Sequence, residues 1–170
     1  IENYLELKRE LEGQGHRFVT ETDTEIIAHA LEQEINDSGC DLASAFKAVL
    51  PRLRGIYALV ALRTREPDLL VAARSGPPLV VGIGADEYFV ASDIPAILMH
   101  TKDVVFVDDH ELVVIRADGA RFETFTGETI EKEPTRIPWD PIMAEKGGFK
   151  HFMLKEIHEQ PRAVRDTLLG

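Results

Sequence analysis

The sequence predicts an α+β fold in which a large mixed or antiparallel sheet is buried between layers of helix. Three observations predict it. Residues up to about 55 have helical periodicity, residues 56–126 contain short apolar runs separated by turns, and the tail from about residue 152 is helical again. The chain has 170 residues, of which 44% are hydrophobic and 29% are charged. A chain of this size and composition can bury one sizeable core.

The first helix is expected to begin just after Asn3, which can cap it, and to end at Gly13 and Gly15. Residues 16–20 then have the β-branched and aromatic character of a short strand. The first part of the chain is therefore expected to be helical with one strand inserted.

Two further helices follow this strand. The second, near residues 24–36, carries apolar side chains four positions apart and should pack on a sheet. The third begins after Asp41 and covers residues 42–53, and Pro51 should make its last turn irregular. The stripe on the second helix consists of Ile27, Leu31 and Ile35.

From residue 56 the hydrophobic pattern becomes that of strands, which are bounded by turns rich in Gly, Pro and Asp. The expected strands are 56–62, 69–73, 79–83, 88–91, 104–107, 111–116 and 121–126. A brief helix is expected at 94–99, with Asp93 as its cap and Pro95 in its first turn. Asp118 and Gly119 should form the hairpin turn between the last two strands.

A Pro-rich connector, residues 134–141, separates these strands from the tail. The tail is expected to be helical over about 152–169 and to be interrupted at Pro161.

Composition excludes several classes of function. The 19 basic and 30 acidic side chains give a formal net charge of −11, which would repel nucleic acid and anionic membrane surfaces. No apolar run approaches the roughly 20 residues that a membrane-spanning helix needs. The single cysteine cannot form an internal disulfide, which fits a reducing compartment, and we expect a cytoplasmic protein.

Common catalytic and metal-binding motifs are absent from the sequence. Cys40 has no histidine or basic side chain near it in sequence that would activate the thiol. The six histidines form no His-Glu-x-x-His pattern, so scattered surface or interface positions are expected and no metal ligands are assigned. The glycines at 82 and 84 are expected in a hairpin turn, because the third glycine of a dinucleotide motif is replaced by Glu87. We expect no cofactor.

The segment before the second helix is more informative. Thr22 and Glu25 have the spacing of a capping box, which would leave the carboxylate of Asp23 free at the first helical position. Such a carboxylate could bind a ligand's ammonium group. An acidic residue in the first turn is also favoured by the helix dipole alone, and the residues by themselves favour this structural role.

Residues 2–8 and 15–29, which include Thr-Glu-Thr-Asp-Thr-Glu at 20–25, resemble the second part of the glutaminase domain of class II glutamine amidotransferases. Four later stretches are similar to the glutamine:fructose-6-phosphate aminotransferase family. They are Arg-Gly-Ile-Tyr-Ala at 54–58, Ala-Arg-Ser-Gly-Pro-Pro-Leu at 73–79, Ala-Ser-Asp at 91–93 and Lys-Glu-Ile-His-Glu-Gln-Pro at 155–161. The last stretch separates this family from the purine-pathway amidophosphoribosyltransferases.

The resemblance implies an N-terminal-nucleophile fold, with two stacked sheets between helical layers. It implies an enzyme that transfers the amide nitrogen of glutamine to fructose-6-phosphate, giving glucosamine-6-phosphate and glutamate. In the family an N-terminal cysteine attacks the amide and an Asn-Gly pair stabilises the oxyanion, which is the chemistry that acyl transfer needs. Asp23 matches the family's aspartate that holds the α-ammonium group of glutamine.

The sequence also departs from the family pattern, because it begins at Ile1. We therefore expect a partial four-layer αββα sandwich that lacks its first strands and its nucleophile. Residues 1–150 would be a truncated glutamine amidotransferase domain, and 151–170 would be the helical start of a linker to a sugar-isomerase half. On this interpretation no residue of the chain is catalytic, Cys40 included, and the chain alone neither hydrolyses glutamine nor makes glucosamine-6-phosphate.

Two other interpretations of the function stay open. One is a non-catalytic amino-acid-binding or regulatory module with a glutaminase fold, and the other is the glutaminase domain of an amidophosphoribosyltransferase. In each case the missing strands would leave open sheet edges and apolar faces, so a homo-oligomer is expected.

Overall fold

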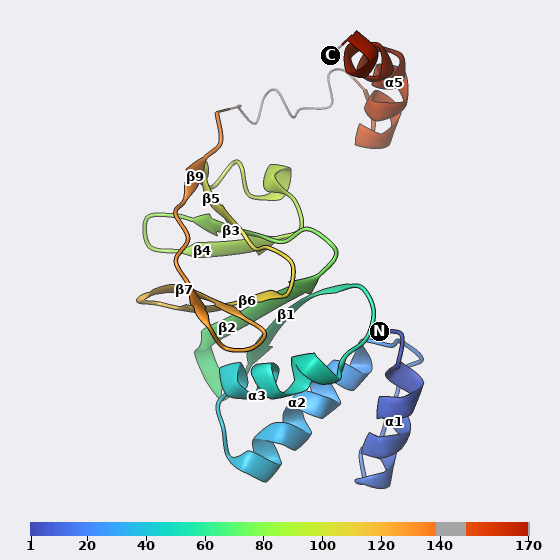
Figure 1. The fold of residues 1–170 in the computed structure, drawn as a ribbon, viewed down its shortest axis with the longest axis vertical. Helices are drawn as coiled ribbons and strands as arrows, with labels where there is room; N and C mark the ends of the chain where they lie inside the picture. Colours follow the sequence, from blue (N-terminus) through green and yellow to red (C-terminus); the bar gives the residue numbers. More distant parts are fainter. Residues whose placement is uncertain (139–148, 170) are drawn as a thin grey trace. The chain divides into compact units, whose positions relative to one another are not determined.

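The computed structural model describes residues 1–138 and 149–169 (Figure 1). The chain divides into two compact units, residues 1–136 and residues 137–170. The boundary after residue 150 that the family resemblance implies stays a prediction.

Three helices come first, as the sequence predicts. α1 is Tyr4–Gly13, α2 is Glu25–Ser38, and α3 is Leu42–Val49, continued by a 3₁₀ turn at Leu50–Arg52 that contains Pro51. The side chain of Asp41 caps α3 by accepting a hydrogen bond from the Ser44 amide at 2.9 Å.

Asn3 precedes α1 as expected, but its side chain does not cap the helix. Its amide nitrogen donates to the Arg52 carbonyl at 2.8 Å, and its oxygen accepts from the Arg54 amide at 2.9 Å. The amide of Glu2 donates a further hydrogen bond of 2.8 Å to the Arg54 carbonyl. These bonds attach the start of the chain to the segment that follows α3.

The strand expected at residues 16–20 is wrong, because these residues form an irregular segment between α1 and α2. The amides of Val19 and Thr20 donate to the side chain of Glu25 instead of to a neighbouring strand. The segment thus meets its hydrogen-bonding needs through a side chain, which the apolar pattern of the sequence could not reveal.

Two antiparallel sheets follow. The first has the order β1-β2-β6-β7-β8 and the second has the order β4-β3-β5-β9. The strands of the first sheet are β1 Tyr57–Arg63, β2 Glu66–Ser75, β6 Glu111–Arg116, β7 Gly119–Thr124 and β8 Thr129–Ile130. Those of the second are β3 Val80–Ile83, β4 Tyr88–Ala91, β5 Asp103–Phe106 and β9 Thr135–Arg136. The seven predicted strands are present, while the two-residue strands β8 and β9 were not predicted.

The five-stranded sheet lies between the helices and the second sheet (Figure 1). One of its faces packs on the helices, with Phe46, Val71 and Leu112 in that core. Its other face packs on the second sheet through a smaller core that includes Val81 and Val113. The predicted α+β class with two stacked sheets is therefore confirmed.

The segment at 94–101 takes the place of an outer layer on the second sheet. It contains a 3₁₀ turn at Ile94–Ala96, shorter than the predicted helix at 94–99, with Asp93 accepting from the Ile94 amide. Gly82 lies beneath this segment, and a Cβ added there would come within 2.9 Å of Ile97 and 2.8 Å of Thr101. In the first unit, the layers are thus helix, sheet, sheet and a short turn segment.

Strand β1 is at the edge of the five-stranded sheet. In the part of the chain that the structure describes, its only strand partner is β2. Val60 and Leu62 are 51% and 70% exposed, on the face of β1 that points away from the helices. An open edge and an exposed apolar face thus occur in the same strand.

The second unit contains α5, Phe152–Leu169. The helix continues through Pro161, so the interruption predicted there is wrong. The predicted connector at 134–141 contains β9, and its residues 139–141 lie outside the described residues. None of the described helices is both long and apolar enough to cross a lipid bilayer.

Candidate functional site

The turn that precedes α2 is organised by the side chain of Glu25. Its carboxylate accepts hydrogen bonds from the Val19 amide at 2.8 Å, and from both the amide and the hydroxyl of Thr20 at 2.8 and 2.5 Å. These bonds, the Thr20 hydroxyl first among them, lower the pKa of Glu25 from 4.5 to about 2.

The capping box predicted between Thr22 and Glu25 does not form. Glu25 reaches back beyond Thr22, and the hydroxyl of Thr22 instead lies 3.1 Å from that of Thr24. Thr24, not Thr22, precedes the first helical residue, and its side chain makes no capping bond. Asp23 therefore lies one residue before the cap, not at the first helical position.

Asp23 lies beside the backbone nitrogen of Ile1. Its carboxylate accepts a hydrogen bond from the amine of Ile1 and forms an ion pair with it. This bond is the main reason why the pKa of Asp23 lies below its usual range, although partial burial opposes the shift. The side chain of Asp23 is 39% exposed.

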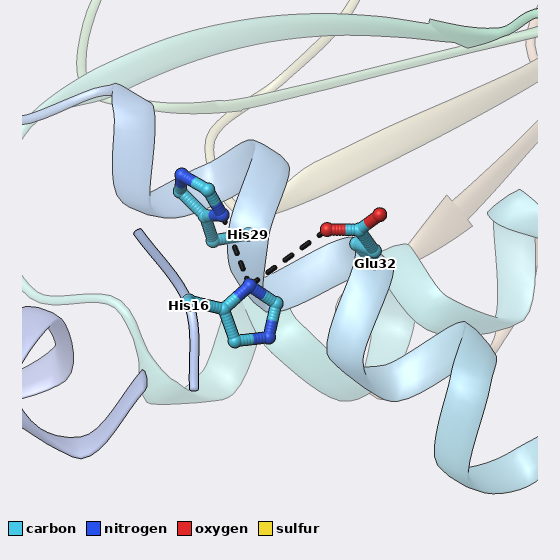
Figure 2. Close-up of side chains that lie close together, drawn as sticks. All are labelled: His16, His29 and Glu32. Atoms are coloured by element: carbon cyan, nitrogen blue, oxygen red, sulfur yellow. Dashed lines mark hydrogen bonds and ion pairs between the residues drawn. The ribbon is translucent and has the colours of Figure 1, made fainter. Parts of the chain in front are cut away.

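Two histidines and a glutamate form a second polar cluster beside this turn. His16 comes from the irregular segment, and His29 and Glu32 lie on the same face of α2 (Figure 2). The Nδ1 atoms of the two histidines are 3.0 Å apart, and Glu32 Oε2 lies 3.7 Å from Nδ1 of His16. The expectation of scattered histidines is thus wrong for His16 and His29. The i,i+3 spacing of His29 and Glu32 was visible in the sequence, whereas the position of His16 required the fold.

Cys40 lies at the opposite end of α2 from Asp23. The helix has 14 residues and is therefore about 21 Å long. Cys40 is half-buried, and its amide donates to the Ser38 hydroxyl at 3.3 Å. The thiol thus lies about the length of α2 away from Asp23, and the interpretation that Cys40 is not catalytic stays a prediction.

The Ala-Arg-Ser-Gly-Pro-Pro-Leu stretch forms a tight turn at the end of β2. Arg74 donates to the carbonyls of Val107 and Gly76 at 3.0 and 2.9 Å, and the Gly76 amide donates to Asp109 at 2.6 Å. That last bond lowers the pKa of Asp109. Gly76 has a φ of 94°, and an added Cβ would come within 2.7 Å of Ile56. This stretch of the family pattern therefore has a structural explanation in the turn itself.

Comparisons with known proteins agree with the family resemblance found in the sequence. A family model described as a glutamine amidotransferase domain matches residues 1–99. The isomerizing glutamine–fructose-6-phosphate aminotransferase of Methanothermobacter thermautotrophicus is 55% identical over 168 residues, which are 99% of this chain and 28% of that protein. The protein of the same name from Caldanaerobacter subterraneus is 51% identical over the whole chain, again 28% of its length. The chain thus spans little more than a quarter of these curated relatives.

Among solved structures, the glutamine phosphoribosylpyrophosphate amidotransferase of B. subtilis, complexed with ADP and GMP, is similar with a TM-score of 0.63 and 30% identity. The match covers 72% of this chain and 27% of that one. A second structure, described as the allosteric regulatory enzyme of purine biosynthesis, has a TM-score of 0.62 and 29% identity. The resemblance to the amidotransferases that the sequence suggested is confirmed.

Proposed function

Because the chain belongs to the glutamine amidotransferase domain family, we propose that it is the glutamine-binding part of an isomerising glutamine:fructose-6-phosphate aminotransferase. Such an enzyme moves the amide nitrogen of glutamine to fructose-6-phosphate and releases glucosamine-6-phosphate and glutamate. The support for this choice is the 55% identity over 99% of the chain, compared with 30% over 72% for the phosphoribosylpyrophosphate amidotransferase.

The observation that carries the proposal is the position of Asp23, the residue that matches the family's glutamine-binding aspartate, in the turn directly before α2. A free glutamine has an α-ammonium group with a positive charge and three donors, which a carboxylate such as that of Asp23 can accept. The turn that holds Asp23 is fixed by Glu25 before any ligand arrives, so binding need not order it. The role of Asp23 is to bind and orient glutamine, and Cys40 takes no part in the chemistry.

The acceptor sugar, in this proposal, is bound by the part of the relatives' length that this chain does not span. The protein is cytoplasmic, in keeping with its single, unpaired cysteine. It binds neither nucleic acid nor membrane surfaces, which its net charge of −11 disfavours.

The test is Asp23→Asn in the protein that carries this chain, with glutamate release from glutamine as the assay. The substitution removes an ion pair from a partly desolvated site, so the KM for glutamine should rise about 10- to 100-fold, the equivalent of about 1.4–2.8 kcal/mol. Glu21→Gln is the matched control, because it removes the same charge from an exposed position in the same turn. An unchanged KM in Asp23→Asn would leave Asp23 with only a role at the helix start.

The acceptor is tested separately. Glutamine-dependent formation of glucosamine-6-phosphate from fructose-6-phosphate supports the proposal, whereas nitrogen transfer to phosphoribosylpyrophosphate would support the purine-pathway alternative. Glutamine binding without turnover of either acceptor would support the non-catalytic module.

We also propose that this chain self-associates through β1, whose edge is open and whose Val60 and Leu62 are exposed. Unpaired strand edges and apolar faces of this kind favour pairing with another chain. Sedimentation of the 170-residue chain over a range of concentrations should show dimers or larger species. A clean monomer at the highest concentration would contradict the proposal.

A further inference from the structure

We propose that His16, His29 and Glu32 form a binding site for one divalent transition-metal ion, of which Zn²⁺ is the best match. The three residues offer two imidazole nitrogens and one carboxylate oxygen, all within 4.8 Å of one another. Imidazole and carboxylate together are typical ligands of Zn²⁺ and of the similar ions Co²⁺ and Ni²⁺.

The distances suit a single ion. Zinc–nitrogen and zinc–oxygen bonds of about 2.0–2.2 Å place neighbouring ligand atoms of a tetrahedral site about 3.3–3.5 Å apart. In the structure the two Nδ1 atoms are 3.0 Å apart, and the Glu32 oxygen is 3.7 Å from Nδ1 of His16. Small side-chain rotations would bring all three atoms to the ligand distances, and a water molecule would complete the tetrahedron.

The second nitrogen of each ring already faces an acceptor. Nε2 of His16 lies 2.8 Å from Oε1 of Gln33, and Nε2 of His29 lies 3.5 Å from Oε1 of Glu25. Metal-binding histidines generally donate their other N–H to a carboxylate or carbonyl group, which orients the ring and makes the ligating nitrogen more basic. Gln33 is itself oriented, because its amide nitrogen donates to Asp37 at 2.8 Å.

These bonds define which nitrogen of each ring carries the proton. The Gln33 oxygen requires an N–H on Nε2 of His16, so the Nδ1 of a neutral His16 is an acceptor. The 3.0 Å contact then requires an N–H on Nδ1 of His29. An ion bound between the rings would displace the proton from Nδ1 of His29. The neutral ring would then carry its proton on Nε2, which can donate a hydrogen bond to Glu25. Metal binding thus changes the tautomer of His29 and leaves that of His16 unchanged.

The surroundings of the two histidines favour metal binding, because both side chains are largely shielded from solvent. The side chains of His16 and His29 are only 10% and 19% exposed, and the ring of Phe18 packs against His29 with 4.3 Å between centroids. Glu32 is 63% exposed and free to turn toward the ion. A bound ion would tie the irregular segment that carries His16 to α2, next to the turn that holds Asp23. Its role is to stabilise this region, and it takes no part in the glutamine chemistry.

The experiment is a titration of the untagged, metal-free chain with ZnCl₂ alone, followed by calorimetry and thermal unfolding. We expect one ion per chain and a higher Tm in its presence. Glu32→Gln should weaken binding at least tenfold without altering the fold, because the side chain is exposed. Glu34→Gln is the control: it removes the same charge two positions further along the same helix, about 200° around its axis, and should bind zinc as the parent does.

Two spectroscopic measurements test the geometry. CoCl₂ should give the intense visible absorption of a four-coordinate site, and ¹⁵N spectra of the histidines should show the proton of His29 moving from Nδ1 to Nε2. The proposal is overturned if zinc does not bind one to one, if Glu32→Gln and Glu34→Gln bind alike, or if the tautomer of His29 does not change. His16→Gln should abolish the cobalt spectrum, and a spectrum that survives it would equally overturn the proposal.

Discussion

The two ends of α2 are held by different kinds of interaction. At the amino end, the carboxylate of Glu25 accepts hydrogen bonds from two backbone amides and a hydroxyl, and Asp23 lies one residue before the helix cap. At the carboxyl end, Gly39 adopts a left-handed conformation, and its amide donates to the Ile35 carbonyl at 2.9 Å. One end is thus organised by ionised side chains and the other by the backbone.

This difference separates the only cysteine of the chain from the charged side chains, because Cys40 lies at the carboxyl end of α2. A thiol is the strongest nucleophile among side chains, but Cys40 lies at the end where no charged group is arranged around a ligand. The amino end instead brings together carboxylates and imidazoles, the groups that bind ammonium groups and metal ions. The charged side chains of this region thus gather at the amino end of α2, away from Cys40.

The largest effect is expected from Glu25→Gln. The amide side chain accepts hydrogen bonds less strongly than a carboxylate, so the Val19 and Thr20 amides should exchange with solvent roughly tenfold faster or more. Hydrogen exchange measured by NMR at pH 7 tests this, with Glu21→Gln as the control in the same turn. Equal exchange in the two variants would mean that the charge of Glu25 does not hold the turn.

The same variant isolates a pH dependence. The pKa of Glu25 is lower in the folded chain, about 2, than its ordinary value of 4.5. Its contribution to stability is therefore fully present above about pH 4.5 and is lost as the pH falls toward about 2. The stability difference between the parent chain and Glu25→Gln should be constant near neutrality and should shrink across that range. A difference that persists unchanged at pH 2.5 would contradict the shift.

Sequence patterns predicted the apolar framework well, because burial follows periodicity. The stripe of Ile27, Leu31 and Ile35 is buried as expected, and β4 and β6 have the predicted bounds. Patterns failed where polar side chains reach across the chain. The bonds from Val19 and Thr20 to Glu25 replaced a predicted strand and a predicted capping box, and the contact between His16 and His29 joins residues 13 positions apart. Asp23 was identified only by family resemblance, and its role stays a proposal.

A smaller effect is expected at the carboxyl end from Gly39→Ala. Gly39 has a φ of 69°, and no atom lies within 4 Å of an added Cβ, so the cost is conformational and not steric. A left-handed residue other than glycine costs about 1–2 kcal/mol in the free energy of unfolding, and asparagine costs less than alanine. Urea unfolding should therefore rank the parent chain above Gly39→Asn and Gly39→Asn above Gly39→Ala. Equal stabilities would mean that α2 can end in another way.

The smallest effect is expected from Cys40→Ala. The side chain is half-buried at the margin of the helical core, so the loss of one sulfur atom should cost less than about 1 kcal/mol. Because α2 separates Cys40 from Asp23 by about 21 Å, glutamate release by the protein that carries this chain should be the same with and without the substitution. The decisive comparison is with Asp23→Asn, which should raise the KM for glutamine. If Cys40→Ala abolished glutamate release by the 170-residue chain, the chemistry would belong to the carboxyl end of α2, and the assignment of function to its amino end would fail.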